Sequence, residues 1–197
     1  NNGIDLSGEG GLVWLKSRTQ SQNNYLFDTA RGPNKFLMSD HTAGEQVVSD
    51  RGVTAFNSGG FDLGSSVGGN RTANNYASWT FRKAPKFFDV VTYTGDGSNT
   101  RRISHSLDTN PGFIVVKKTS AAQDWVCAHR YDSFSNAFNL NTTGIQFGAG
   151  YIATPSDTSF GVNAYGNAND LNTSGQTYVA YLFAHNNSDG EFGPDSD

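Results

Sequence analysis

The strongest constraint on the fold of this chain is an internal repeat. Residues 11–16 (Gly-Leu-Val-Trp-Leu-Lys) match residues 112–117 (Gly-Phe-Ile-Val-Val-Lys), which lie 101 positions further on (112 minus 11). Residues 75–81 (Asn-Tyr-Ala-Ser-Trp-Thr-Phe) match residues 177–183 (Thr-Tyr-Val-Ala-Tyr-Leu-Phe), and their tyrosines are 102 positions apart (178 minus 76). A repeat of about 100 residues is too long for one coil of a solenoid. It predicts two tandem domains or two halves of one sandwich.

Weaker matches fill the space between these ends. They pair residues 24–28 with 124–128, residues 34–38 with 136–140 and, after a slip of two or three positions, residues 61–64 with 160–163. Such a slip is expected where a loop varies in length. We therefore predict three segments: a first unit at 1–85, N-terminally incomplete, a second unit at 86–187, and a linker or tail at 188–197.

The first unit is expected to be incomplete because of the segment that joins the units. Residues 87–107 contain Gly95-Asp96-Gly97 between two apolar stretches, which predicts a hairpin. The second stretch has a counterpart at residues 4–6, whereas the first stretch, residues 87–94, has none. The sequence therefore indicates an interior piece of a longer, repetitive protein.

Local pattern and composition both favour strands. Tyr25 and Phe27 alternate with other residues at the period of a half-buried strand, and Gly-, Asn- and Pro-containing turn signals separate the apolar stretches. Gly, Asn, Ser and Thr fill about two fifths of the 197 positions, which leaves few of the residues that favour helices. We predict an all-β fold of two tandem, related β-sandwich units, jelly-roll or lectin-like, with Gly/Asn-rich turns.

Charge and hydropathy argue against two classes of partner. The net charge is −4 and the basic residues are scattered, so no face for the phosphates of a nucleic acid is expected. No apolar run, such as residues 113–116, approaches the roughly 18 residues of a membrane span, so no membrane insertion is expected. Cys127, the single cysteine, alternates like a buried strand position and is predicted to be a core thiol.

The sequence holds no arrangement typical of an enzyme or a metal site. The four histidines are far apart and lack metal-ligand spacing, and no Gly-x-Ser-x-Gly elbow is present. Residues 167–172 resemble a calcium loop only in composition, since the required Gly and Glu are missing. We expect no catalytic residue, no metal and no cofactor.

Six residues are candidates for ligand binding: Asp28, Arg31, Asp124, Trp125, His129 and Arg130. Sugar recognition uses flat aromatic faces beside side chains that can form several hydrogen bonds with hydroxyls. The alternative is structural: Trp125 in the core, and Asp28 and Arg31 as an ion pair or as a cap of the Gly32-Pro33 turn. Trp14 and Trp79 lie inside apolar strands and are predicted to be core residues.

Several motifs follow one another in a characteristic order along the chain. They are Gly-Leu-Val-Trp-Leu-Lys (11–16), Leu-Phe-Asp-Thr-Ala-Arg-Gly (26–32), Phe-Asn-Ser-Gly-Gly-Phe-Asp-Leu-Gly (56–64), Tyr-Ala-Ser-Trp-Thr-Phe-Arg-Lys-Ala-Pro (76–85), Phe-Phe-Asp-Val-Val-Thr-Tyr-Thr-Gly-Asp-Gly (87–97), Asn-Pro-Gly-Phe-Ile-Val-Val-Lys (110–117) and Thr-Tyr-Val-Ala-Tyr-Leu-Phe-Ala (177–184). In this order the chain resembles a repeat domain of tailed-phage virion proteins, fibre-like or tail-associated chains that are common in marine phages. The resemblance implies a β-rich, lectin-like sandwich with an adhesive or structural duty and no assigned catalytic residues.

These observations lead to a set of functional expectations. The first is a non-enzymatic phage structural protein, a tail-fibre or fibre-like adhesion or spacer domain. The alternatives are a carbohydrate-binding module for a host receptor, a capsid decoration protein and, last, a polysaccharide-degrading tail enzyme. The expected partners are other copies of the chain, with a trimer as one option, other virion proteins and host surface glycan. The expected location is the virion, an extracellular particle assembled in the host cytoplasm.

Overall fold

The computed structural model describes residues 2–49, 51–65, 69–143, 148, 150–164 and 170–185. Regular structure in this part of the chain is β apart from one 3-10 turn, Arg130–Asp132. The chain divides into two compact units, unit 1 (Asn1–Lys83) and unit 2 (Ala84–Asp197), whereas the sequence had placed the boundary after residue 85. The predicted tail at residues 188–197 and most of the predicted loop at 167–172 lie outside the described residues. Within the described ranges no helix has the length and apolar character needed to cross a membrane.

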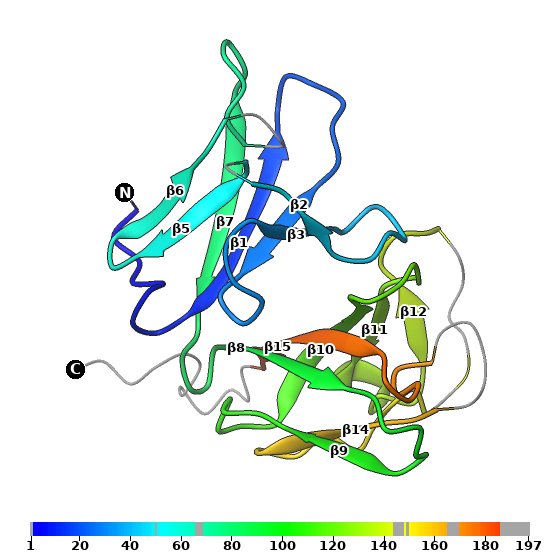
Figure 1. The fold of residues 1–197 in the computed structure, drawn as a ribbon. Helices are drawn as coiled ribbons and strands as arrows, with labels where there is room; N and C mark the ends of the chain where they lie inside the picture. Colours follow the sequence, from blue (N-terminus) through cyan, green and yellow to red (C-terminus); the bar gives the residue numbers. More distant parts are fainter. Residues whose placement is uncertain are drawn as a thin grey trace. The chain divides into compact units, whose positions relative to one another are not determined.

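Unit 1 consists of a five-stranded antiparallel sheet and a hairpin (Figure 1). The sheet has the strand order β4-β3-β2-β1-β7, and the hairpin joins β5 to β6. The strands are β1 (Gly11–Ser17), β2 (Tyr25–Asp28), β3 (Lys35–Met38), β4 (Gln46–Val47), β5 (Val53–Asn57), β6 (Gly60–Leu63) and β7 (Tyr76–Arg82). The buried core lies between them, with Val13, Phe27 and Phe36 from the sheet against Val53 of β5.

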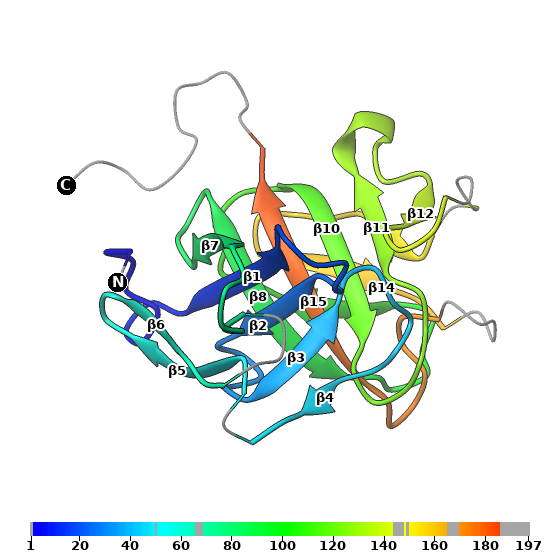
Figure 2. The ribbon, with the colours of Figure 1, turned by 90° about the horizontal axis from the view of Figure 1, so that it is seen from above.

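Unit 2 consists of a five-stranded and a three-stranded antiparallel sheet. Strands of the larger sheet are labelled in Figure 2. The strand orders are β12-β11-β10-β15-β8 and β13-β14-β9. The strands are β8 (Phe88–Thr94), β9 (Arg101–Ser104), β10 (Pro111–Lys118), β11 (Val126–His129), β12 (Ala137–Asn139), β13 (Ile152–Ala153), β14 (Ser159–Val162) and β15 (Thr177–Ala184). The chain is therefore all-β, with several antiparallel sheets, as predicted.

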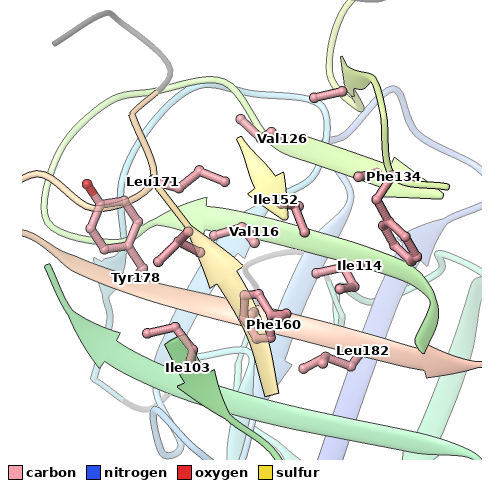
Figure 3. Close-up of a cluster of buried hydrophobic side chains, with 14 of the residues drawn as sticks. Ile103, Ile114, Val116, Val126, Phe134, Ile152, Phe160, Leu171, Tyr178 and Leu182 are labelled. Atoms are coloured by element: carbon pink, nitrogen blue, oxygen red, sulfur yellow. The ribbon is translucent and has the colours of Figure 1, made fainter. Parts of the chain in front are cut away.

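The core of unit 2 gathers side chains from both of its sheets (Figure 3). Ile114 of β10 and Leu182 of β15 come from the large sheet, and Ile103 of β9 and Phe160 of β14 come from the small one. All four side chains are buried, as expected when alternate residues of facing strands share one core. This arrangement is consistent with a β-sandwich.

The two large sheets have four strands in the same order. β3-β2-β1-β7 in unit 1 corresponds to β12-β11-β10-β15 in unit 2. The pairing registers set Leu12 opposite Asp28, and Phe113 opposite His129. Because Leu12 and Phe113 are equivalent, Asp28 is equivalent to His129.

The register corrects the sequence alignment of two strands. The alignment of residues 24–28 with 124–128 was one position off, and so was that of 34–38 with 136–140, since the sheets set Leu37 equivalent to Phe138. Side chains alternate across a strand, so a slip of one position moves each residue to the opposite face of the sheet. In strands of only three or four residues, the hydrophobic pattern is too short to fix the register.

Each unit has a lysine near the end of an inner strand, β1 or β10, that bonds to the loop after that strand. The Nζ of Lys117 donates a hydrogen bond to the carbonyl of Gln123 at 2.8 Å. In unit 1 the equivalent Lys16 donates to the carbonyl of Gln22, again 101 positions earlier. The same contact at the same offset supports the equivalence of β1 and β10.

Candidate functional site

A cavity of about 270 Å³ opens in unit 2. It is lined by Asn110, Arg130, Ser133, Phe134, Thr154 and Pro155. These residues come from three places in the chain: the residue before β10, the 3-10 turn after β11, and the segment after β13. Polar side chains from separate segments that converge on one concavity are typical of a ligand site.

Local hydrogen bonds shape the wall that follows β11. The Nδ1 of His129 accepts a hydrogen bond from the backbone N–H of Tyr131 at 3.0 Å, which caps the 3-10 turn. Ser133 and Phe134 both have a left-handed backbone, with φ of 59° and 58°. Phe134 is buried in the core and anchors the turn, while Arg130 and Ser133 remain exposed. Non-glycine residues in this conformation are strained, and such residues cluster at functional sites.

Arg102 fixes the opposite wall. Its guanidinium donates to the carbonyl of Thr154 at 2.7 Å and to the carbonyl of Ser159 at 2.9 Å. Thr154 also has a positive φ, 32°. The strained backbone at Thr154 is thus held by an arginine that binds both sides of the β13–β14 connection.

The chemistry of the cavity suits a ligand rich in hydroxyl groups. The side chains of its lining residues Arg130, Asn110, Ser133 and Thr154 include a guanidinium, an amide and two hydroxyls. The neighbouring Tyr131 is 93% exposed and offers an aromatic face. Among the described residues no group of three or more His, Cys, Asp or Glu side chains could hold a metal ion.

Asp28 and Arg31, two of the six predicted binding residues, form an ion pair inside unit 1. The Nε of Arg31 lies 2.6 Å from a carboxylate oxygen of Asp28, and both side chains are almost completely buried. Arg31 also donates to the carbonyl of Leu26 at 3.1 Å, and its guanidinium lies 3.4 Å from Glu45. Asp28 and Arg31 therefore lock the turn after β2 in the way the structural alternative describes.

Two further predicted residues also lie inside the fold. Trp125 is completely buried, and its ring stacks on Tyr181 at 6.3 Å between centroids, so it presents no face to a sugar. The carboxylate of Asp124 accepts hydrogen bonds from the amides of Asn139 at 3.1 Å and Asn141 at 2.8 Å. Trp125 is therefore a core residue, as the structural alternative describes, because its buried ring has no free face for a ligand.

Of the six predicted residues, only Arg130 lines the cavity, and His129 supports it through the turn. Sequence reasoning missed Asn110, Ser133 and Thr154, which are small polar residues in loops and resemble many others in this Asn- and Ser-rich chain. Their distinguishing feature is a strained backbone at Ser133 and Thr154, which a sequence does not reveal.

Two buried groups of unit 2, Cys127 in β11 and Lys117 in β10, have shifted pKa values. Burial raises the pKa of the Cys127 thiol to about 12, so it stays protonated at neutral pH, in agreement with the predicted core thiol. Burial lowers the pKa of Lys117 to about 8, although the nearby Asp124 acts in the opposite direction. Neither group lines the cavity.

Comparison with known proteins gives one family. No curated protein and no solved structure matches the chain significantly. A family model described as "Domain of unknown function (DUF7483)" matches residues 3–194, a range that includes parts of both compact units. Because this match spans nearly the whole sequence, the chain belongs to the DUF7483 family.

Proposed function

We propose that the chain is a non-enzymatic structural module of a phage virion, built as a tail-fibre or fibre-like spacer from two tandem jelly-roll or lectin-like sandwiches. The observation that carries the proposal is the recurrence of one strand order in both large sheets, with only residues 83–87 between β7 and β8. Direct repetition of a β unit is typical of repetitive structural proteins. The motif order that resembles tailed-phage virion proteins supports the virion setting.

The internal use of polar side chains also supports a structural role. Asp28, Arg31, Asp124 and Lys117 all bind other parts of the chain. Each of them fixes a turn or a loop end. Polar groups that are fully engaged within the fold add rigidity and leave little chemistry for a substrate.

Two experiments test the structural proposal. Sedimentation of the full-length protein at high concentration should reveal a homo-oligomer, and a chain that stays monomeric would count heavily against the structural proposal. Antibodies against residues 1–197, imaged on purified particles by electron microscopy, should label a fibre or tail. Labelling across the capsid lattice would instead indicate a decoration protein.

The cavity of unit 2 favours a second candidate function, the binding of host surface glycan. Its support is the set of hydrogen-bonding groups beside the exposed Tyr131. A glycan array should then give signals with the native chain that Arg130→Ala and Tyr131→Ala each abolish, because each variant removes a proposed sugar contact. Both side chains are exposed, so these variants should remain folded. Arg18→Ala, which removes an exposed arginine from unit 1, is the matched control.

The outcomes of the glycan experiment separate the remaining alternatives. No binding to any host polysaccharide would exclude the glycan-binding candidate and leave the spacer untouched. Release of reducing sugars from host capsule would instead indicate a polysaccharide-degrading enzyme and contradict a non-enzymatic module.

A further inference from the structure

We propose that the outer edge of β7 is an acceptor site for an added antiparallel strand with the chemistry of β8 and its following Gly-Asp-Gly turn. This inference is independent of the virion setting, because it depends only on a comparison of the two units. The partner is an extended polypeptide segment, bound by β-augmentation.

Backbone hydrogen bonds show which groups of β7 face outward. Lys83 donates to the carbonyl of Gly10 at 2.9 Å, and Arg18 donates to the carbonyl of Asn75 at 2.8 Å. In an antiparallel pair, hydrogen-bonded and non-hydrogen-bonded residues alternate, so the odd-numbered residues of β7 bond to β1. The even-numbered residues therefore point their N–H and C=O groups away from β1; they are Tyr76, Ser78, Thr80 and Arg82. Among the described residues no strand pairs with this edge.

The equivalent edge in unit 2 is filled. Gly95 donates to the carbonyl of Gln176 at 2.8 Å, and Ala184 donates to the carbonyl of Phe87 at 2.9 Å, so the even-numbered residues of β15 bond to β8. These residues are Tyr178, Ala180, Leu182 and Ala184, each 102 positions after its counterpart in β7 (178 minus 76). Unit 2 thus displays the partner that β7 lacks, in an equivalent register.

Side chains of β7 are exposed where their counterparts are covered. Trp79 was predicted to be a core residue but is 50% exposed, whereas the equivalent Tyr181 is 1% exposed. Tyr181 stacks on Phe88 of β8 with ring centroids 6.5 Å apart. Ser78 is exposed as well, whereas the equivalent Ala180 is buried. A half-exposed tryptophan beside an unpaired strand edge marks an interaction surface.

A third correspondence lies in the loop before β7. The backbone N–H of Arg71 donates to the hydroxyl of Tyr76 at 3.0 Å. In unit 2 the backbone N–H of Thr173 donates to the hydroxyl of Tyr178 at 3.1 Å, so the two loops are equivalent. The residue before each donor is an asparagine, Asn70 or Asn172.

The two asparagines differ in what they bind. Asn172 is completely buried and donates to the carboxylate of Asp96 at 2.6 Å and to the carbonyl of Ser98 at 2.8 Å, both in the turn that follows β8. Asn70 is exposed and donates to the carbonyl of Gly64 at 3.0 Å. Asn70 is thus placed to receive an aspartate of the same kind of turn.

The occupant is a separate segment and not a second copy of this chain. In each copy β8 already pairs with β15 along its whole length, so it is not available for the β7 edge of a neighbour. The occupant must match β8 in three features: an apolar residue to cover Trp79, an aromatic one opposite Tyr76, in the way Tyr93 stacks on Tyr178 at 5.0 Å, and an acidic turn for Asn70.

The test uses the full chain and a synthetic peptide with the sequence of residues 87–98 (Phe-Phe-Asp-Val-Val-Thr-Tyr-Thr-Gly-Asp-Gly-Ser), extended by two lysines for solubility. The peptide has no tryptophan, so binding should shift the emission of Trp79 to shorter wavelength, and Trp79→Phe should remove this shift. Titration calorimetry measures the affinity independently of the fluorescence.

Three variants probe the proposed geometry. N-methylation of Val91 in the peptide, and Ser78→Pro in the chain, each delete one hydrogen bond of the new ladder and should weaken binding about tenfold or more. The N–H of Ser78 faces away from β1, so Ser78→Pro should leave the fold intact, which circular dichroism checks. Asn70→Ala should weaken binding of the peptide with aspartate, yet have no effect on a peptide that carries Asp96→Ala.

Two results would overturn the proposal. One is the absence of any binding to a chain that circular dichroism shows to be folded. The other is a concentration-dependent dimer of the chain that Ser78→Pro abolishes, because it would mean that two β7 edges pair with each other. Neither result bears on whether the protein belongs to a virion, so this proposal and the proposed function can fail separately.

Discussion

Single buried polar residues hold loops of unit 2 in place. Lys117 is completely buried, and its Nζ donates to the carbonyls of Gln123 and Lys118 at 2.8 and 3.1 Å. Asn172 is buried too and holds Asp96 and Ser98. These residues stabilise the fold only while their hydrogen bonds are made, since a buried polar group without a partner is costly.

The lowered pKa of Lys117, about 8, predicts a pH dependence of stability. Between this value and the ordinary pKa of about 10.5, the unfolded chain binds a proton that the folded chain has released, so the free energy of unfolding rises with pH. Each unit of pKa difference corresponds to about 1.4 kcal/mol. In urea unfolding at pH 7, 8.5 and 10, the free energy of unfolding of the native chain should rise relative to that of Lys117→Met, which keeps the Cys127 thiol and the other titrating groups. Parallel curves for the two proteins would contradict it.

A matched pair of asparagines gives a second prediction. Asn172→Ala removes three hydrogen bonds that join the loop before β15 to the turn after β8. This loss should lower the free energy of unfolding by about 2–4 kcal/mol. Asn70→Ala removes one exposed hydrogen bond and should cost about 0.5 kcal/mol or less. Chemical denaturation of both variants measures the difference. Equal losses would mean that the turn around Asp96 is not held through Asn172.

At the scale of strands, the sequence predicted more of the fold than of the site. Residues 11–16 and 112–117 are predicted to be strands because they are apolar and contain β-branched or aromatic residues, and neither strand lies at an edge of its sheet. The sequence does not predict β4, because both of its residues are exposed and show no apolar pattern. The alignment of β2 with β11 is one residue out of register, because both strands are short. The cavity could not be predicted beyond Arg130, since its walls depend on left-handed residues and on the long-range bonds of Arg102.

Gly32 and Gly52 both have a left-handed backbone, but only at Gly52 would an added Cβ also clash with a neighbouring side chain. A Cβ on Gly52 would lie 2.3 Å from the ring of Phe27, whereas a Cβ on Gly32 would meet no atom within 4 Å. Gly32→Ala should cost only the left-handed penalty of about 1–2 kcal/mol. Gly52→Ala should cost that amount and about 1–3 kcal/mol more, because the buried ring must move. Thermal unfolding of both variants measures this, and equal melting temperatures would show that the Phe27 ring yields freely.

On the scale of the whole molecule, the two units differ in completeness. Unit 2 has β8 outside β15, whereas unit 1 has nothing equivalent outside β7 among the described residues. The extra strand of unit 1, β4, lies at the opposite edge, next to β3, and does not compensate. Phe88 of β8 is one of the rings that cover Tyr181, which is 1% exposed, whereas Trp79 is 50% exposed.

This difference predicts the effect of a fusion. A copy of residues 86–101 placed directly before residue 1 supplies the missing strand at the matching offset and should raise the melting temperature of unit 1. In a domain of this size, each added kcal/mol corresponds to about 4–8 °C. Calorimetry of the fusion measures the rise, Ser78→Pro within it should cancel the gain, and a fusion with residues 86–101 in scrambled order is the control. An equal rise with the scrambled order would contradict strand addition.

The place of β8 in the chain also decides where such a protein can be cut. The Gly95-Asp96-Gly97 turn looks like a natural boundary, yet the strand before it completes the sheet that follows it. A fragment that begins at this turn would remove the Phe88 ring from Tyr181 and open a second sheet edge to aggregation. A fragment that begins at Ala84 keeps the strand with the sheet it closes. In a longer array of such units, fragment boundaries should therefore be chosen from the backbone pairing of the strands and not from the most visible turn.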